Sequence, residues 1–358
     1  MPETDALTAG LLQRLPEPPR RVAVLRASRI GDFICAIPAF RALRAALPEA
    51  RITLITVPLL RGTAERLPYF DTVASFPGFP GIAAQLFEPS AALRFFEHMQ
   101  AERFDLAVQL QGSGVYSNPF VLMLGARYTA GFVRAGDHAA RLDAALPLPE
   151  HGHEIRRTLA LPMFLGASAA GEHTEYPLTH VDHLRAEALL LGMTPPFIGL
   201  HPTAHDPLRR WPLDRFEATA RALQQQFGGT IVILGASGEY EYNRTLAARL
   251  RGACRDLTGL TALGTLGAVL TRLSVFISSD SGPAHIAYAL NVPTVTVFRA
   301  RGAARYGPLQ SGPFVALEPY DDADRVPAEQ VTHAAAALID SAVMRTPTTA
   351  DLCAQSAR

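Results

Sequence analysis

Short apolar runs, each followed by a helical pattern, are the feature that most restricts the fold of this chain. Residues 21–27 (RVAVLRA) form such a run, and after Gly31 apolar residues recur at helical spacing from Ile34 to Leu47. Pro48 then ends the pattern, and residues 51–57 (RITLITV) form the next run. A strand, a helix and a second strand in this order force the two strands to lie parallel.

The same alternation continues through the rest of the sequence. A further strand is expected at 104–110 (FDLAVQL), after a helical stretch around 93–101. The strands expected in the second half are FIGLHP (197–202), TIVILG (230–235), VFISSD (275–280) and TVTVFR (294–299). Helical patterns separate them, the clearest at 213–227. The sequence therefore predicts an α/β protein with two Rossmann-like lobes and a cleft between them.

The expected boundary lies between two helical stretches, 153–166 and 181–193, and the break at Pro195-Pro196. The length of 358 residues fits two domains of roughly 150 residues each. The expected parts are an N-terminal extension (1–20), an N-terminal Rossmann-like lobe (21–180), a C-terminal Rossmann-like lobe (181–325) and a final helix with a polar tail (326–358).

Charge composition excludes several classes of function. Lys+Arg and Asp+Glu both total 33, so no uniform basic field favours nucleic acid as the main partner. All of the basic residues are arginine, which excludes Schiff-base and Ser-Lys mechanisms. Any anion that this protein binds is therefore bound by arginine or by backbone N–H groups.

The cysteines and the N-terminal stretch bear on the cellular compartment. Cys35, Cys254 and Cys353 form no CxxC pair, so neither a disulfide framework nor a zinc site is indicated, and a reducing cytoplasm suits them. Residues 1–19 lack a basic start and an apolar run, and no apolar segment reaches about 18 residues. We therefore expect no signal peptide and no membrane span.

A polar loop follows the first strand. In parallel sheets, ligands bind beyond the carboxyl ends of the strands, where helix N-termini favour anions. The segment Arg26 to Asp32 (RASRIGD) puts the Asp32 carboxylate at the start of a helix, facing the expected cleft. Asp32 either takes part in chemistry or caps the helix, and position alone leaves both readings open.

A long loop at 201–212 follows the first strand of the second lobe. Thr203 and Arg209 are candidates for binding phosphate, because a guanidinium is a natural bidentate partner of a diphosphate. The alternative is that Arg209 and Arg210 are solvated charges beside a packed Trp211.

Two patterns in the sequence imitate metal sites. His201 and His205 have the spacing of a metal pair, but that spacing places both on one face only in a helix, whereas this loop contains prolines. Asp322-Ala323-Asp324 spells DxD, but it lies in a polar loop far from any expected nucleotide-binding strand. We therefore predict no metal site and no cofactor.

Two further loops end strands of the second lobe. In the loop at 235–239, Glu239 either accepts hydrogen bonds from ribose hydroxyls or interacts with the dipole of the next helix. In the loop at 278–285, hydroxyls, a glycine and a carboxylate converge at a helix start, which favours phosphate binding over a simple cap. Its candidate ligand-binding residues are Asp280, Ser281, Gly282 and His285.

In this order the four loops resemble those of glycosyltransferase family nine, which includes the ADP-heptose:lipopolysaccharide heptosyltransferases and has the two-lobed GT-B fold. The match spans roughly residues 21 to 300. Asp280 to His285 (DSGPAH) is similar to the family's D-[ST]-G-x-x-H diphosphate loop, and Gly31-Asp32 with Pro38 resembles its G-D-x5-P signature. Arg209, before Trp211-Pro212, stands where the family has a basic residue, often lysine.

The resemblance implies roles for individual residues. Asp32 would be the catalytic base, and Glu239 would bind the donor ribose. The donor-binding set would be Thr203, Arg209, Glu239, Asp280, Ser281, Gly282 and His285. The acceptor-side set would be Ser28, Arg29, Gly31 and Gln111. Two departures bear on substrate identity: Gln109 stands where the family often has an acidic residue, and Arg299 follows Phe298 in place of glycine.

The implied activity is inverting, metal-independent transfer of a sugar, in the commonest case heptose from ADP-heptose, to a hydroxyl of a lipopolysaccharide core or related glycan. The alternatives are another nucleotide sugar with a protein or small-molecule acceptor, and a non-catalytic sugar-nucleotide-binding protein. An oxidoreductase is disfavoured because the first loop lacks G-x-G-x-x-G. The implied location is the cytoplasm, with peripheral inner-membrane contact left open because a lipid-linked acceptor would lie there.

Overall fold

The structure is a computed structural model that describes residues 9–82, 85–137, 141–252, 254–299, 302–319 and 326–345, without the side chains of 342–345. The chain divides into two compact units, Met1–Pro177 and Leu178–Arg358. The sequence placed this boundary at 180/181. The DxD triplet at 322–324 and the polar tail lie outside the described residues.

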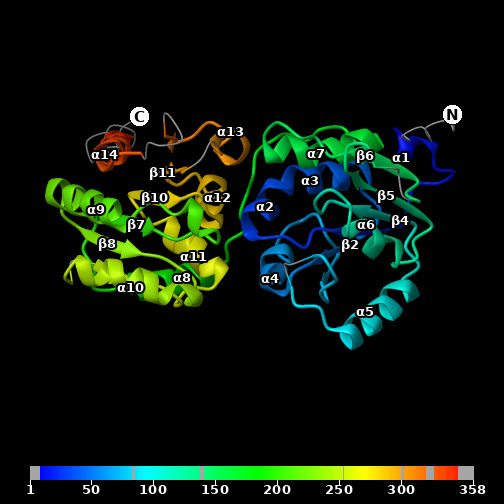
Figure 1. The fold of residues 1–358 in the computed structure, drawn as a ribbon, viewed down its shortest axis with the longest axis horizontal. Helices are drawn as coiled ribbons and strands as arrows, with labels where there is room; N and C mark the ends of the chain where they lie inside the picture. Colours follow the sequence, from blue (N-terminus) through cyan, green and yellow to red (C-terminus); the bar gives the residue numbers. More distant parts are fainter. Residues whose placement is uncertain are drawn as a thin grey trace, which may run out of the picture. The chain divides into compact units, whose positions relative to one another are not determined.

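The first unit, coloured blue to green in Figure 1, contains a six-stranded parallel sheet. Its strand order is β3-β2-β1-β4-β5-β6. Its strands are β1 (Arg21–Leu25), β2 (Arg51–Thr56), β3 (Thr72–Ser75), β4 (Leu106–Gln109), β5 (Tyr128–Val133) and β6 (Ala144–Pro147). Its helices are α1 (Leu11–Arg14), α2 (Ile30–Cys35), α3 (Ile37–Ala46), η1 (Pro58–Leu60), α4 (Arg61–Ala64), α5 (Pro89–Ala101), α6 (Ser117–Leu122) and α7 (Glu154–Leu165). Burial is complete for most of β1, β2 and β4, as expected for parallel strands covered on both faces.

The second unit contains another six-stranded parallel sheet, in the order β12-β11-β10-β7-β8-β9. Its strands are β7 (Phe197–His201), β8 (Thr230–Ile233), β9 (Cys254–Asp256), β10 (Val275–Ser279), β11 (Thr294–Val297) and β12 (Phe314–Leu317). Its helices are α8 (His180–Leu190), η2 (Pro207–Arg209), α9 (Leu213–Phe227), η3 (Ser237–Glu239), α10 (Tyr240–Arg249), α11 (Leu263–Leu270), α12 (Gly282–Ala289), α13 (Ala303–Tyr306) and α14 (Ala328–Arg345).

Both sheets have the same topology. In each unit the first strand lies between the second and the fourth, so the strand order reverses next to it: β1 pairs with β2 and β4, and β7 pairs with β8 and β10. Ligands bind beyond the carboxyl ends of strands at such a switch point, because the flanking loops diverge there. Each unit therefore has one favoured place for a ligand. The predicted α/β architecture with two Rossmann-like halves is confirmed.

One expected helix is divided into two. The sequence predicted a continuous helix from Ile34 to Leu47, but α2 ends at Cys35 and α3 begins at Ile37. Pro38 occupies the first turn of α3, where its missing N–H costs no hydrogen bond, whereas a continuous helix would lose one there.

The core of the second unit forms around Trp211 and α9. Trp211, Phe216 and Leu223 are completely buried, and the Trp211 indole N–H donates to the Val326 carbonyl at 2.9 Å. Trp211 is thus packed in the core, whereas Arg209 and Arg210 beside it both have protein partners. In the part of the chain that is described, no helix is long and apolar enough to cross a membrane.

The segment that ends the first unit is fastened to that unit by side-chain contacts. They are Arg156–Glu172 at 2.8 Å, Arg41–Glu175 at 3.0 Å and Thr63–Tyr176 at 3.3 Å. Only a few residues later, the Thr179 hydroxyl and the Asp182 carboxylate form a capping box that begins α8. The passage from one unit to the other is therefore confined to the residues around Pro177 and Leu178.

Candidate functional site

A pocket of about 530 Å³ lies at the switch point of the first unit. The loops after β1 and β4 supply most of its wall, and Arg134 comes from the loop after β5. The polar or charged residues that line it are Ser28, Arg29, Asp32, Gln111, Ser113, Tyr116, Ser117 and Arg134. Three of the four acceptor-side residues expected from sequence therefore meet here with Asp32. The fourth, Gly31, is buried in the first turn of α2.

Asp32 lies in the first turn of α2 and is partly exposed. The N-cap residue of this helix is Arg29, and no side chain caps it. Within the described residues the Asp32 carboxylate accepts no hydrogen bond, so it does not cap the helix, although its place in the first turn suits the helix dipole. A carboxylate that lines a polar pocket and is not engaged by the protein is free to accept a proton from a ligand.

Buried Arg26 holds the two loops of this pocket together. Its guanidinium donates to the Asp32 carbonyl at 2.6 Å and to the Leu110 carbonyl at 2.5 Å. One side chain thus joins the loop after β1 to the loop after β4.

Gln109 holds the loop after β4 in place through hydrogen bonds. Its side chain is completely buried, and its amide N–H groups donate to the Gln111 carbonyl at 3.0 Å and the Ser117 hydroxyl at 2.5 Å. Its amide oxygen accepts the Gln111 N–H at 3.0 Å. Gln109 therefore fixes the pocket wall and does not line the pocket.

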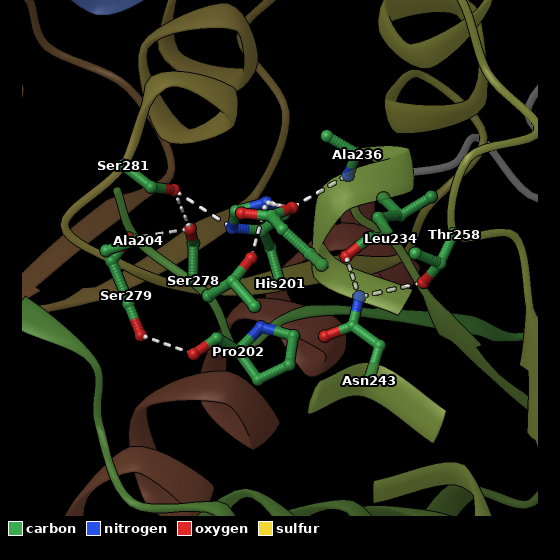
Figure 2. A network of polar contacts seen from close by, with 12 residues as sticks. His201, Pro202, Ala204, Leu234, Ala236, Asn243, Thr258, Ser278, Ser279 and Ser281 are labelled. Atoms are coloured by element: carbon green, nitrogen blue, oxygen red, sulfur yellow. Dashed lines mark hydrogen bonds and ion pairs between the residues drawn. The ribbon is translucent and has the colours of Figure 1, made fainter. Parts of the chain in front are cut away.

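A hydrogen-bonded network around His201 occupies the switch point of the second unit (Figure 2). His201 ends β7, and its Nδ1 lies 3.0 Å from the Ser281 hydroxyl. Its Nε2 lies 3.3 Å from the Thr203 hydroxyl and 3.6 Å from the Glu239 carboxylate. The Ser281 hydroxyl also lies 3.0 Å from that of Ser278. His201 thus joins the loops after β7, β8 and β10.

Glu239 is held as a carboxylate by its neighbours. Burial raises its pKa, but hydrogen bonds from His201, Thr203 and the Ala236 N–H outweigh that effect and lower the pKa to about 2. The Ala236 N–H donates to it at 2.7 Å. Glu239 is therefore fixed in its charged form at the end of β8.

Arg209 is positioned by groups from two other segments. Its guanidinium lies 3.3 Å from the Asp280 carboxylate and 5.7 Å from the centre of the Tyr306 ring. The Arg209 side chain is half exposed, whereas that of Asp280 is nearly buried. Asp280 therefore orients Arg209 and leaves part of the guanidinium open to a ligand.

The N-terminus of α12 lies beside this network. Ser281 is its N-cap residue, and no side chain caps the helix. Among the described residues, the N–H groups of Ser281 and Gly282 have no acceptor. His285 is buried further along the helix. The centre of its ring lies 5.9 Å from that of the Tyr288 ring and 6.2 Å from that of the Tyr306 ring. The free N–H groups and the helix dipole favour an anion.

Comparison with known proteins gives the family. Residues 92–326, more than half of the chain, match the family model described as glycosyltransferase family 9 (heptosyltransferase). The chain belongs to glycosyltransferase family 9. Lipopolysaccharide heptosyltransferase 3 of Escherichia coli is 23% identical over 294 residues, which cover 75% of this chain and 80% of that protein.

Solved structures show the same GT-B fold. A family 9 glycosyltransferase from Veillonella parvula has a TM-score of 0.78 at 22% identity, covering 90% of this chain and 98% of its own. The ADP-heptose LPS heptosyltransferase II of E. coli has a TM-score of 0.74 at 20% identity, covering 90% and 99%. The family match, together with this fold, makes the protein a glycosyltransferase of the heptosyltransferase family.

Sequence reasoning missed the structural roles of two residues in this family 9 glycosyltransferase. His201 was considered only as half of a metal pair with His205, which is exposed on the loop. No three His, Cys, Asp or Glu side chains in the described ranges are grouped as a metal site. Gln109 was considered only as a departure that bears on substrate identity, and its hydrogen bonds to the loop after β4 were not foreseen. The signal that could have identified both is their position at the carboxyl ends of β7 and β4, next to the switch points.

Proposed function

We propose that this protein is an inverting, metal-independent glycosyltransferase that transfers a heptose from ADP-heptose to a hydroxyl of a lipopolysaccharide core or related glycan. The observation that carries the proposal is the unengaged Asp32 carboxylate in the polar pocket of the first unit. The relatives named as lipopolysaccharide heptosyltransferases support the choice of donor and acceptor. A lipid-linked acceptor would bring the protein to the surface of the inner membrane.

The acceptor binds in the pocket of the first unit. Its reacting hydroxyl donates a hydrogen bond to Asp32, which takes the proton as the oxygen attacks the anomeric carbon. The new glycosidic bond forms while the bond to the diphosphate breaks, so the configuration at that carbon is inverted. Ser28, Arg29 and Gln111 orient the acceptor.

The donor binds in the second unit. Arg209 and the free N–H groups of Ser281 and Gly282 stabilise the negative charge that grows on the diphosphate as the sugar leaves. Glu239 accepts hydrogen bonds from the ribose hydroxyls. Thr203 is completely buried, so it acts by holding His201 and Glu239 and does not touch phosphate. Hydrogen-bond donors fixed by the protein thus take the place of a divalent metal ion.

The test is Asp32→Asn, a nearly isosteric change that removes the proton acceptor. We expect kcat to fall by about 10² or more, the lower range for general-base catalysis. Thermal stability and ADP affinity should stay unchanged, because the Asp32 carboxylate makes no described hydrogen bond and the donor binds in the other unit. Near-normal turnover of this variant, measured as heptose transfer to the glycan acceptor, would show that Asp32 is not the catalytic base.

A further inference from the structure

Tyr116 is an open aromatic residue in the wall of a polar pocket. It lines the pocket of the first unit together with Asp32, and it is 55% exposed. Ligand sites combine aromatic surface with a few polar groups that fix orientation. An open ring in the same pocket as an unengaged carboxylate therefore indicates a surface for a ligand.

One face of the Tyr116 ring rests on Gly81. A Cβ atom added to Gly81 would lie 2.1 Å from Tyr116 Cδ1, 2.3 Å from Cγ and 2.5 Å from Cε1. Such similar distances to three consecutive ring atoms place the added atom over the face of the ring, because an approach at the edge would bring one atom much closer than its neighbours. Gly81 covers one face, and more than half of Tyr116 is exposed, so the opposite face is open.

The segments on both sides of this contact are fixed by other side chains. The Phe79 ring, from the same loop as Gly81, lies 5.4 Å from the Phe120 ring of α6, measured between ring centres. The Ser117 hydroxyl, directly after Tyr116, donates to a loop carbonyl at 2.5 Å. The ring is thus held in place before any ligand arrives, which lowers the entropy cost of binding.

We propose that Tyr116 is a stacking platform for a sugar ring of the acceptor. This inference rests on the proposed function, because it takes the pocket to be the acceptor site. The face of an aromatic ring is negative, so it attracts the slightly positive C–H groups on one side of a sugar ring. Stacking buries those C–H groups and leaves the hydroxyls at the edge of the sugar free to reach Asp32. A serine or threonine of a protein acceptor offers no such ring.

Binding of a deacylated lipopolysaccharide core oligosaccharide tests the platform, with calorimetry in the absence of any donor. Tyr116→Ala should raise the Kd about tenfold, the order of effect seen when an aromatic stacking partner is removed. Tyr116→Phe keeps the flat face and should bind as the native chain does. Tyr116→Leu keeps apolar bulk without a flat face, so it should resemble Tyr116→Ala. Tyr240→Ala is the control, because Tyr240 is 50% exposed and lies in the second unit.

Transfer kinetics separates stacking from a general structural effect. In Tyr116→Ala the acceptor KM should rise about tenfold while kcat at saturating acceptor stays unchanged, because the ring touches the sugar and not the reacting atoms. A fall in kcat together with a lower melting temperature would mean that Tyr116 supports the fold and would overturn the proposal. Equal binding by Tyr116→Leu and Tyr116→Phe would also overturn it, since no flat face would then be needed.

Gly81→Ala tests the platform from the other side. The added Cβ would displace the ring, so the acceptor Kd should rise. In a Tyr116→Ala background no ring is left to displace, and the same change should have little further effect. Losses that add in the double variant would overturn the proposal. Gly152→Ala controls for backbone strain, because Gly152 also has a positive φ but has open space around it. If Gly81→Ala does not fold, the Tyr116 variants decide.

The outcomes separate this inference from the proposed function. Unchanged oligosaccharide binding by Tyr116→Ala would overturn the platform, even if heptose transfer occurs and depends on Asp32. If Tyr116→Ala weakens binding but ADP-heptose gives no transfer, the proposed donor is wrong and the platform stands. If the native chain does not bind the oligosaccharide, the pocket is not a sugar site and both proposals fail.

Discussion

At the proposed donor site, the neighbours of Glu239 determine the charge of its side chain. Its pKa is lowered from 4.5 to about 2 because hydrogen bonds outweigh burial. A lowered pKa stabilises the fold above the ordinary pKa, and the contribution is lost as the pH falls toward the lowered value. Glu239→Gln should therefore cost at most about 3 kcal/mol of unfolding free energy near pH 6.

The difference between the native chain and Glu239→Gln should shrink as the pH falls below about 4.5 toward 2. Urea unfolding at a series of pH values measures it. Glu241→Gln is the control, because Glu241 lies in the first turn of the next helix and is exposed. A difference that stays constant over this range would mean that the Glu239 carboxylate is not stabilised by its neighbours.

The sequence was sufficient to select candidate site residues, but not to predict which of them contact one another. Asp32, Arg209 and Ser281 were found because each follows a recognisable strand, and strand ends determine where ligands bind. His201 has an equally clear position, yet its role depends on Glu239 and Ser281, which are distant in the chain. Contacts between loops are made by tertiary structure, and no local pattern reports them.

At the scale of elements, the loop at 111–117 should determine acceptor affinity. Gln109→Glu replaces an amide that donates to the Gln111 carbonyl and the Ser117 hydroxyl with a carboxylate that can only accept. The loop must then rearrange. We expect the acceptor KM to rise about tenfold or more, as for other lost buried hydrogen bonds, and the donor KM to stay unchanged.

Gln85→Glu provides the control for this variant, because it makes the same chemical change at an exposed position of the first unit. Steady-state kinetics with each substrate varied in turn gives both KM values. Equal changes in the two KM values would indicate a general loss of structure, and no change in either would show that the loop does not need Gln109.

The N-terminus of α12 should make a divalent ion unnecessary. Its free N–H groups and the Arg209 guanidinium lie in the same unit, and both favour a diphosphate. Turnover should therefore persist in excess EDTA. Loss of turnover in EDTA, with recovery on adding Mg²⁺ or Mn²⁺, would contradict this expectation.

The elements themselves were predicted unevenly, for physical reasons. β1, β2, β4, β7, β8, β10 and β11 were predicted because their buried apolar runs are long or end in clear loops. β3, β6, β9 and β12 were missed because they are short strands at the sheet edges and are only partly buried. β5 was missed although it is buried, because Thr129 and Gly131 interrupt its apolar run. Pro38 is a signal in the sequence for the division between α2 and α3. We expected one continuous helix because apolar residues keep helical spacing on both sides of Pro38.

At the scale of the whole molecule, the proposed donor site lies entirely within Leu178–Arg358. This unit has its own sheet and its own core around Trp211 and Phe216. The fragment 178–358 should therefore fold alone and bind ADP with an affinity close to that of the whole chain. Calorimetric titration of both checks this. A folded fragment that fails to bind ADP would mean that the first unit supplies a donor contact.

The short passage around Pro177 and Leu178 has a consequence for how such proteins diversify. Each sheet is complete on its own side of that point, so the described strands are never shared between the two units. A first half taken from another family member could be grafted there without cutting through either core. Recombination at this single junction would exchange one proposed acceptor pocket for another and leave the proposed donor-binding unit unchanged.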